Sequence, residues 1–119
     1  MGRYTGVALD NVVINSGKVT GLQRSAPVTK TAAYTVGAAD DYIIMNGSGS
    51  LALTLPTPAR NAGRSIKVKT VAAQTVTSAS SNVVPRAGGA AGTAILAATA
   101  GAWAELVSDG TNWVIMAGG

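Results

Sequence analysis

The chain has 119 residues, nine Lys and Arg, five Asp and Glu, and a formal net charge of +4. This length suits one domain with a modest core. Cysteine and histidine are both absent, which excludes a disulfide framework and the commonest metal ligands, and removes the commonest general base. Small side chains dominate and there is no Phe, so a single copy buries little apolar area and we expect a homo-oligomer.

The first thirty residues carry most of the net positive charge and show no sustained hydrophobic periodicity. They hold four basic residues against one acidic residue, Asp10, and a single apolar run at 12–14. This pattern favours an extended arm over residues 1–30 with one or two short strands, ordered partly by contact with another molecule, and the alternative is a strand that joins the main sheet. The segment MGRYTGVALD has no apolar core of a secretory signal. The absence of cysteine fits synthesis in a reducing cytoplasm, although secreted proteins can also lack cysteine.

From residue 31 onward, short runs rich in Val, Ile and Thr alternate with turn-forming residues, and no segment shows helical periodicity. The turn spacing predicts an all-β, jelly-roll-like antiparallel β-sandwich over residues 31–119. Between Asp41 and Lys69 and again near Asp109-Gly110, which suits a two-residue type I′ turn, we expect antiparallel neighbours. The expected strands are 31–36, 41–46, 51–55, 64–71, 74–78, 82–85, 93–97, 102–108 and 111–116.

The faces of three expected strands differ in character. In the strand at 64–71, Ile66 and Val68 share one face while Lys67 and Lys69 share the other, so we predict a core side and a basic, wet side. The strands at 42–45 and 113–116 are apolar on both faces, which indicates a central core position or contact with a neighbouring subunit. The candidate subunit contacts are Tyr42, Ile44, Trp113 and Ile115.

No catalytic, cofactor or metal site is expected. Asp40 and Asp41 are adjacent, so on a strand their side chains point to opposite faces and do not form a paired acid and base. The serines lack a histidine partner. The glycine-rich segments at 47–50 and 87–92 do not follow a P-loop or dinucleotide pattern.

The charge and hydropathy patterns indicate neither a nucleic-acid partner nor a membrane span. The basic residues are scattered without the interleaved aromatic residues of RNA-binding modules, so a nucleic-acid partner is not expected, and an acidic protein surface explains the charge equally well. The uncharged stretch at 87–104 is rich in Gly, Ala and Thr, so we expect no membrane span.

Several motifs resemble the β-rich domains of tailed-bacteriophage virion proteins. They are Tyr34-Thr35-Val36, Leu53-Thr54-Leu55-Pro56, Asn61-Ala62-Gly63-Arg64 before a Lys-bearing strand, and Ser108-Asp109-Gly110-Thr111-Asn112-Trp113. The resemblance covers about residues 31–116. Such modules occur in tail fibres, in spikes and in capsid decoration (cement) proteins, and they are commonly trimeric.

The resemblance implies a decoration protein, because the module follows only a short basic segment. We therefore expect a homotrimer made in the host bacterial cytoplasm that binds the major capsid protein on the outer surface of the virion. The alternative is a tail fibre or tailspike component that attaches to a host-surface glycan, with Tyr42, Trp103 or Trp113 as stacking platforms. The expected capsid-binding residues of the arm are Arg3, Tyr4, Leu9, Val12, Ile14, Lys18, Leu22 and Arg24.

Overall fold

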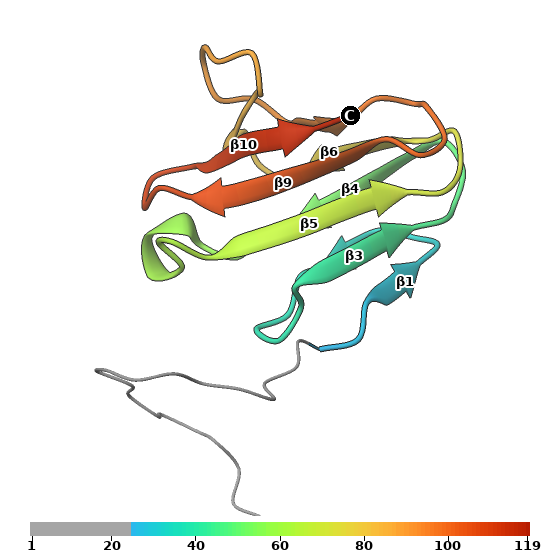
Figure 1. Ribbon diagram of the computed structural model, residues 1–119, viewed down its shortest axis with the longest axis horizontal. Coiled ribbons are helices and arrows are strands. Elements are labelled where there is room, and N and C mark those ends of the chain that lie inside the picture. Colours follow the sequence, from blue (N-terminus) through green and yellow to red (C-terminus); the bar gives the residue numbers. More distant parts are fainter. Residues whose placement is uncertain (1–24) are drawn as a thin grey trace, which may run out of the picture.

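The computed structural model describes residues 25–119, which form two mixed β-sheets with no α-helix in this range. The two sheets face each other, with the smaller one behind the larger in Figure 1. The six-stranded sheet has the order β1 (Val28–Lys30), β3 (Tyr42–Met45), β5 (Ser65–Thr70), β9 (Trp103–Ser108), β10 (Trp113–Gly118) and β7 (Val83–Val84). The four-stranded sheet has the order β2 (Tyr34–Thr35), β4 (Ser50–Thr54), β6 (Thr75–Ser78) and β8 (Ala94–Leu96). A 3-10 turn at Pro58–Arg60 precedes β5.

The first six strands wind as a flat coil, because the chain crosses to the other sheet after every strand. Strands β1, β3 and β5 therefore lie side by side in parallel in the larger sheet, and β2, β4 and β6 do so in the smaller one. In register, Tyr42 lies opposite Lys67 in one sheet and Ser50 lies opposite Thr75 in the other. Each turn of the coil thus contributes one strand to each face of the core.

Antiparallel strands cover one end of this coil. Strand β9 pairs antiparallel with both β5 and β10, and β8 pairs antiparallel with β6. The expectation of antiparallel neighbours between Asp41 and Lys69 is therefore wrong: β3 and β4 lie in different sheets, and Asn46-Gly47 belongs to a crossing between the sheets. The all-β class is confirmed. The jelly-roll topology is not, because five of the eight strand pairings among residues 25–119 are parallel.

The expected hairpin near the C-terminus is present as β9 and β10, but its loop is longer than a two-residue type I′ turn. Ser108 pairs with Trp113, which leaves four residues in the loop. The Asp109 carboxylate accepts hydrogen bonds from the backbone N–H groups of Asn112 at 2.7 Å and Thr111 at 2.9 Å, and these bonds lower its pKa. Gly110 has a φ of 94°, a left-handed conformation that favours glycine.

The core lies between the two sheets and is built from the inward face of each strand. Alternation along β5 and β9 buries Ile66, Val68 and Leu106, as period-two patterning requires. The largest fully buried side chain is Trp113, whose indole Nε1 donates a hydrogen bond of 2.9 Å to the Pro56 carbonyl. This bond satisfies the one polar atom that a tryptophan brings into a core.

Most expected strands agree closely with the structure, and one further short strand lies before residue 31, where the sandwich was expected to begin. Strand β1 falls within the segment that the sequence assigned to the arm, and its Val28 lies opposite Ile43 at the edge of the larger sheet. Its three residues, Val-Thr-Lys, are too few to show a period. The described end of that segment therefore includes a strand of the main sheet, which was the alternative interpretation for this region.

Candidate binding surface

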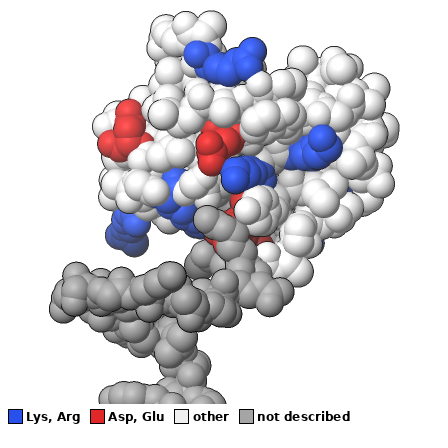
Figure 2. Space-filling view, in the orientation of Figure 1, with Lys and Arg blue, Asp and Glu red and all other residues white. Residues whose placement is uncertain are grey.

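The outer face of the six-stranded sheet carries large and charged side chains that do not pack into the core. The strand register sets two rows of side chains across it: Tyr42, Lys67 and Glu105 in one, and Ile44, Lys69 and Trp103 in the next. Figure 2 views this face and shows basic and acidic groups scattered over a largely uncharged surface. The predicted basic side of β5 is confirmed, because Lys67 and Lys69 are exposed there.

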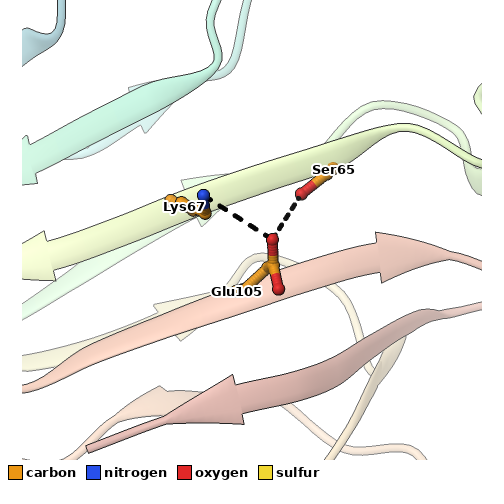
Figure 3. A network of polar contacts seen from close by, with 3 residues as sticks. All are labelled: Ser65, Lys67 and Glu105. Carbon is orange, nitrogen blue, oxygen red and sulfur yellow. Dashed lines mark hydrogen bonds and ion pairs between the residues drawn. The ribbon is translucent and has the colours of Figure 1, made fainter.

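The first row contains a small polar network (Figure 3). The Lys67 ammonium lies 3.8 Å from the Glu105 carboxylate, which also accepts a hydrogen bond of 3.2 Å from the Ser65 hydroxyl. The Lys67 ammonium lies 5.4 Å from the centre of the Tyr42 ring, within cation-π range. Because the Lys67 side chain is 45% exposed, water screens this pair and it contributes little to stability.

The second row is more apolar and keeps a cation with no acidic partner among residues 25–119. The Lys69 ammonium donates a hydrogen bond of 3.3 Å to the Gly101 carbonyl, and no carboxylate of that range pairs with it. Trp103 beside it is 40% exposed, which is unusual for so large an apolar side chain. On the same hairpin, Met116 is 62% exposed. Apolar surface and an available positive charge therefore occur together.

A hollow of about 370 Å³ lies over these rows, and we call it the β3–β5–β9 groove. Aromatic, aliphatic and lysine side chains form its walls, and among the described residues that line it only the lysines are charged. The lining residues are Pro27, Tyr42, Ile43, Ile44, Lys67, Val68, Lys69 and Trp103.

A second hollow, of about 560 Å³, lies where β8 meets β9 and β10. Small side chains and backbone dominate its lining, with Trp103, Ile95, Leu96 and Ile115 as the larger apolar groups, and Arg86 is the one charged side chain among the described residues that line it. The Arg86 guanidinium donates a hydrogen bond to the Gly118 carbonyl. Arg86 is thus already engaged in holding the adjacent loop to β10.

One group of ionisable side chains shares direct hydrogen bonds, but its contacts explain it as a structural clamp. The Asp40 carboxylate accepts hydrogen bonds from the Tyr34 hydroxyl at 2.5 Å and the Gly37 N–H at 2.7 Å. The Tyr34 bond is the main cause of the lowered pKa of Asp40 and of the raised pKa of Tyr34. The Arg64 guanidinium donates to the carbonyls of Gly37 at 2.8 Å and Asp40 at 2.7 Å. These bonds tie the β2–β3 loop to the start of β5.

The four candidate subunit contacts divide between the two faces of the larger sheet. Tyr42 and Ile44 lie half-buried on the outer face, where a partner can reach them. Trp113 and Ile115 belong to the core of the single chain, with Trp113 0% exposed. Their burial explains them as core residues. The candidate residues of the arm lie outside the described range.

Trp103 was singled out in the sequence only as one of three aromatic residues. Its position had a local signal, because Ala102, Ala104 and Leu106 alternate with Trp103 and Glu105 along one strand. A tryptophan that shares a strand face with a glutamate is expected on the wet side. The structure shows that arrangement.

Residues 25–119 contain neither a metal-binding cluster nor a helix suited to cross a membrane. No group of three or more carboxylate, thiol or imidazole side chains in this range is placed to hold a metal ion. No helix in the same range has the length and apolar character needed to cross a membrane.

Comparison with known proteins identified no relative. No protein-family model, curated protein or solved structure matches the chain. The resemblance to phage virion modules therefore rests on the sequence motifs alone.

Proposed function

We propose that this protein is a non-catalytic structural component of a phage virion, a capsid decoration protein that binds the outer capsid surface as a homotrimer and stabilises contacts between capsomers. The observation that carries the proposal is the outer face of the six-stranded sheet, where Trp103, Ile44 and Lys69 are presented together. A rigid β-sheet with apolar anchors and cations on its solvent side suits attachment to another protein.

The proposed attachment combines the sheet with the basic segment before it. Apolar side chains would supply most of the affinity, and the basic residues would speed association and fix the register of the contact. A trimer would present three copies of each contact at once, so that even modest single contacts give a long-lived complex. The major capsid protein is the partner in this proposal, and the virion surface is the location.

Co-sedimentation with emptied capsids of the phage that encodes the chain tests the proposal. Full-length protein is expected to pellet with capsids and to raise the temperature at which they disrupt. A variant with Lys18→Ser and Arg24→Ser removes two positive charges of the N-terminal segment, and removal of residues 1–24 deletes the segment itself. If both variants pellet and protect capsids as well as the unchanged protein does, the arm has no role. Light scattering measures the mass and tests the trimer.

A tail-fibre role with glycan recognition is the second candidate, and the exposure of Trp103 favours it. Exposed aromatic rings are stacking platforms for sugar rings, whereas the buried Trp113 has no face to offer. A glycan array separates the two candidates. Glycan binding that is lost in Trp103→Ala, without capsid binding, would favour the fibre. A blank array together with capsid binding would favour decoration.

A further inference from the structure

We propose that the β3–β5–β9 groove is a docking site for an acidic polypeptide segment that carries an apolar anchor residue. This inference names the partner chemistry of the outer sheet face and so rests on the proposed binding role. It concerns described residues only, none of which is among the expected capsid-binding residues of the arm.

The shape and lining of the groove select an apolar occupant. Its volume of about 370 Å³ has room for one or two large side chains, and its floor and walls are ring and aliphatic surface from Tyr42, Ile44 and Trp103. The hydroxyl groups of a neutral sugar need several hydrogen-bonding partners, but the described residues that line the groove include no Asn, Gln, Asp, Glu or Arg. An aliphatic or aromatic anchor fits these walls better than a sugar does.

The charge of the groove selects an acidic occupant. Lys69 stands in the centre of its row, between Ile44 and Trp103, and has no carboxylate partner within residues 25–119. Lys67 holds Glu105 only at 3.8 Å and remains 45% exposed. A carboxylate placed beside the anchor would meet Lys69 at the edge of an apolar surface, where water screens the pair less than in bulk solvent.

A second copy of the chain is a poorer occupant than an acidic segment. In a two-fold symmetric contact across this groove, Lys67 and Lys69 of one copy approach the same lysines of the other, which costs energy. A three-fold contact would set a different surface of the chain against the groove, and the oligomer measurement below tests that case. Glu105 is the one carboxylate in the two rows, and Lys67 and Ser65 already engage it within the chain. The two rows of described side chains therefore lack an unengaged carboxylate that would make them complementary to themselves.

The test uses full-length ¹⁵N-labelled protein and short synthetic peptides in which Glu alternates with Leu. One control peptide carries Lys in place of Glu, and another carries Ser in place of Leu. The two tryptophans give an internal control, because the Trp103 indole is accessible and the Trp113 indole is buried against Pro56. Trp103 lines both the groove and the second hollow, whereas Lys69 lines the groove and not the second hollow, so the Lys69→Glu variant locates the bound peptide. We expect the acidic, apolar peptide to shift the Trp103 indole resonance, to leave the Trp113 resonance in place, and to bind more weakly as salt is raised.

Variants assign the binding to named residues. Lys69→Glu and Trp103→Ala are each expected to weaken peptide binding by about tenfold or more. Arg60→Glu makes the same charge change on the exposed 3-10 turn away from the groove, and is expected to stay within about twofold of the unchanged protein. Unfolding midpoints recorded for each variant separate loss of contact from loss of fold.

Three results would overturn the inference. The first is equal binding of the basic peptide, or binding that Lys69→Glu leaves unchanged. The second is an oligomer that Lys69→Glu or Trp103→Ala dissociates, which would make the groove a contact between copies. The third is a Trp103 fluorescence as protected from acrylamide as that of Trp113 in the free protein, which would mean that the groove is already filled. The peptide assay contains no capsid, so a failure of capsid binding leaves its result intact, and the reverse also holds.

Discussion

Trp103 and Trp113 lie on adjacent strands of one hairpin, yet they face opposite sides of the six-stranded sheet. Trp113 is 0% exposed, fills the core and satisfies its indole N–H with the Pro56 carbonyl. Trp103 is 40% exposed and borders a groove with Lys69 and Ile44. The same residue type therefore stabilises the fold on one face and remains available for binding on the other. This difference predicts that stability and binding can be separated by mutation.

The largest expected effect is a loss of stability when the buried tryptophan of this pair is removed. Trp113→Ala removes the largest fully buried side chain and leaves the Pro56 carbonyl without its donor, so we expect a loss of about 3–5 kcal/mol in the free energy of unfolding. Trp103→Ala is expected to cost less than about 1 kcal/mol. Urea unfolding followed by circular dichroism measures both.

If Trp113→Ala fails to fold, the substitution of each tryptophan by phenylalanine allows the same comparison of stability. Trp113→Phe retains most of the ring volume but loses the hydrogen bond to Pro56, for an expected cost of about 1–3 kcal/mol. Equal destabilisation by Trp103→Phe and Trp113→Phe would contradict the assignment of the two faces.

The second prediction compares two glycines, of which Gly47 lies where the chain crosses from β3 in one sheet to β4 in the other. A Cβ at Gly47 would lie 2.6 Å from the Thr31 carbonyl oxygen and 2.9 Å from Leu51 Cδ1, so Gly47→Ala is expected to cost about 1–3 kcal/mol. A Cβ at Gly92 would meet no atom within 4 Å, so Gly92→Ala is expected to change the free energy of unfolding by less than about 0.5 kcal/mol. Thermal unfolding of the two variants checks this, and equal midpoints would contradict the close crossing.

The third prediction concerns the clamp between the β2–β3 loop and β5. The Tyr34 hydroxyl and the Gly37 N–H lower the pKa of Asp40, so its stabilising effect is present above the unfolded pKa of about 3.9 and is lost as pH falls through the lower folded pKa. Asp40→Asn is expected to cost about 1 kcal/mol at neutral pH after allowance for solvent screening, and to make the acid loss of stability shallower.

Urea unfolding at a series of pH values from neutral to acid measures that change in slope. Parallel curves for the unchanged protein and Asp40→Asn would show that the clamp carboxylate contributes nothing to the pH dependence of stability.

The smallest expected effect lies on the outer face. The Lys67–Glu105 pair is exposed and its atoms are 3.8 Å apart, so its coupling energy is expected to be below about 0.5 kcal/mol. A double-mutant cycle with Lys67→Ala and Glu105→Ala measures this energy. A coupling of more than about 1 kcal/mol would assign the pair a structural role and weaken the separation of the two faces.

Local pattern predicted the strands and their faces well, for physical reasons that are visible in particular residues. The alternation of Ile66 and Val68 with Lys67 and Lys69 fixes which side of β5 is buried, because successive side chains point to opposite faces. Pairing partners were not predictable in this way. The Tyr42–Met45 strand pairs with β5 beyond the next strand in sequence, and that choice depends on packing between distant segments.

The candidate site was predicted in part for the same reasons. A strand that is apolar on both faces does not reveal whether its second face meets a sheet or a partner, so the sequence left Trp113 as a candidate for either the core or an interface, and the structure places it in the core. The outward position of Trp103 was readable from its alternation with alanines. The groove itself was not, because it joins side chains of three strands that are separated in sequence.

Capsid co-sedimentation of the Lys69→Glu, Trp103→Ala double variant tests the central claim most directly, since both changes lie on the outer face of the larger sheet. We predict an unfolding free energy within about 1 kcal/mol of the unchanged protein and a loss of capsid affinity of about tenfold or more. Capsid binding that stays unchanged in a folded double variant would contradict the claim that this face is a binding surface.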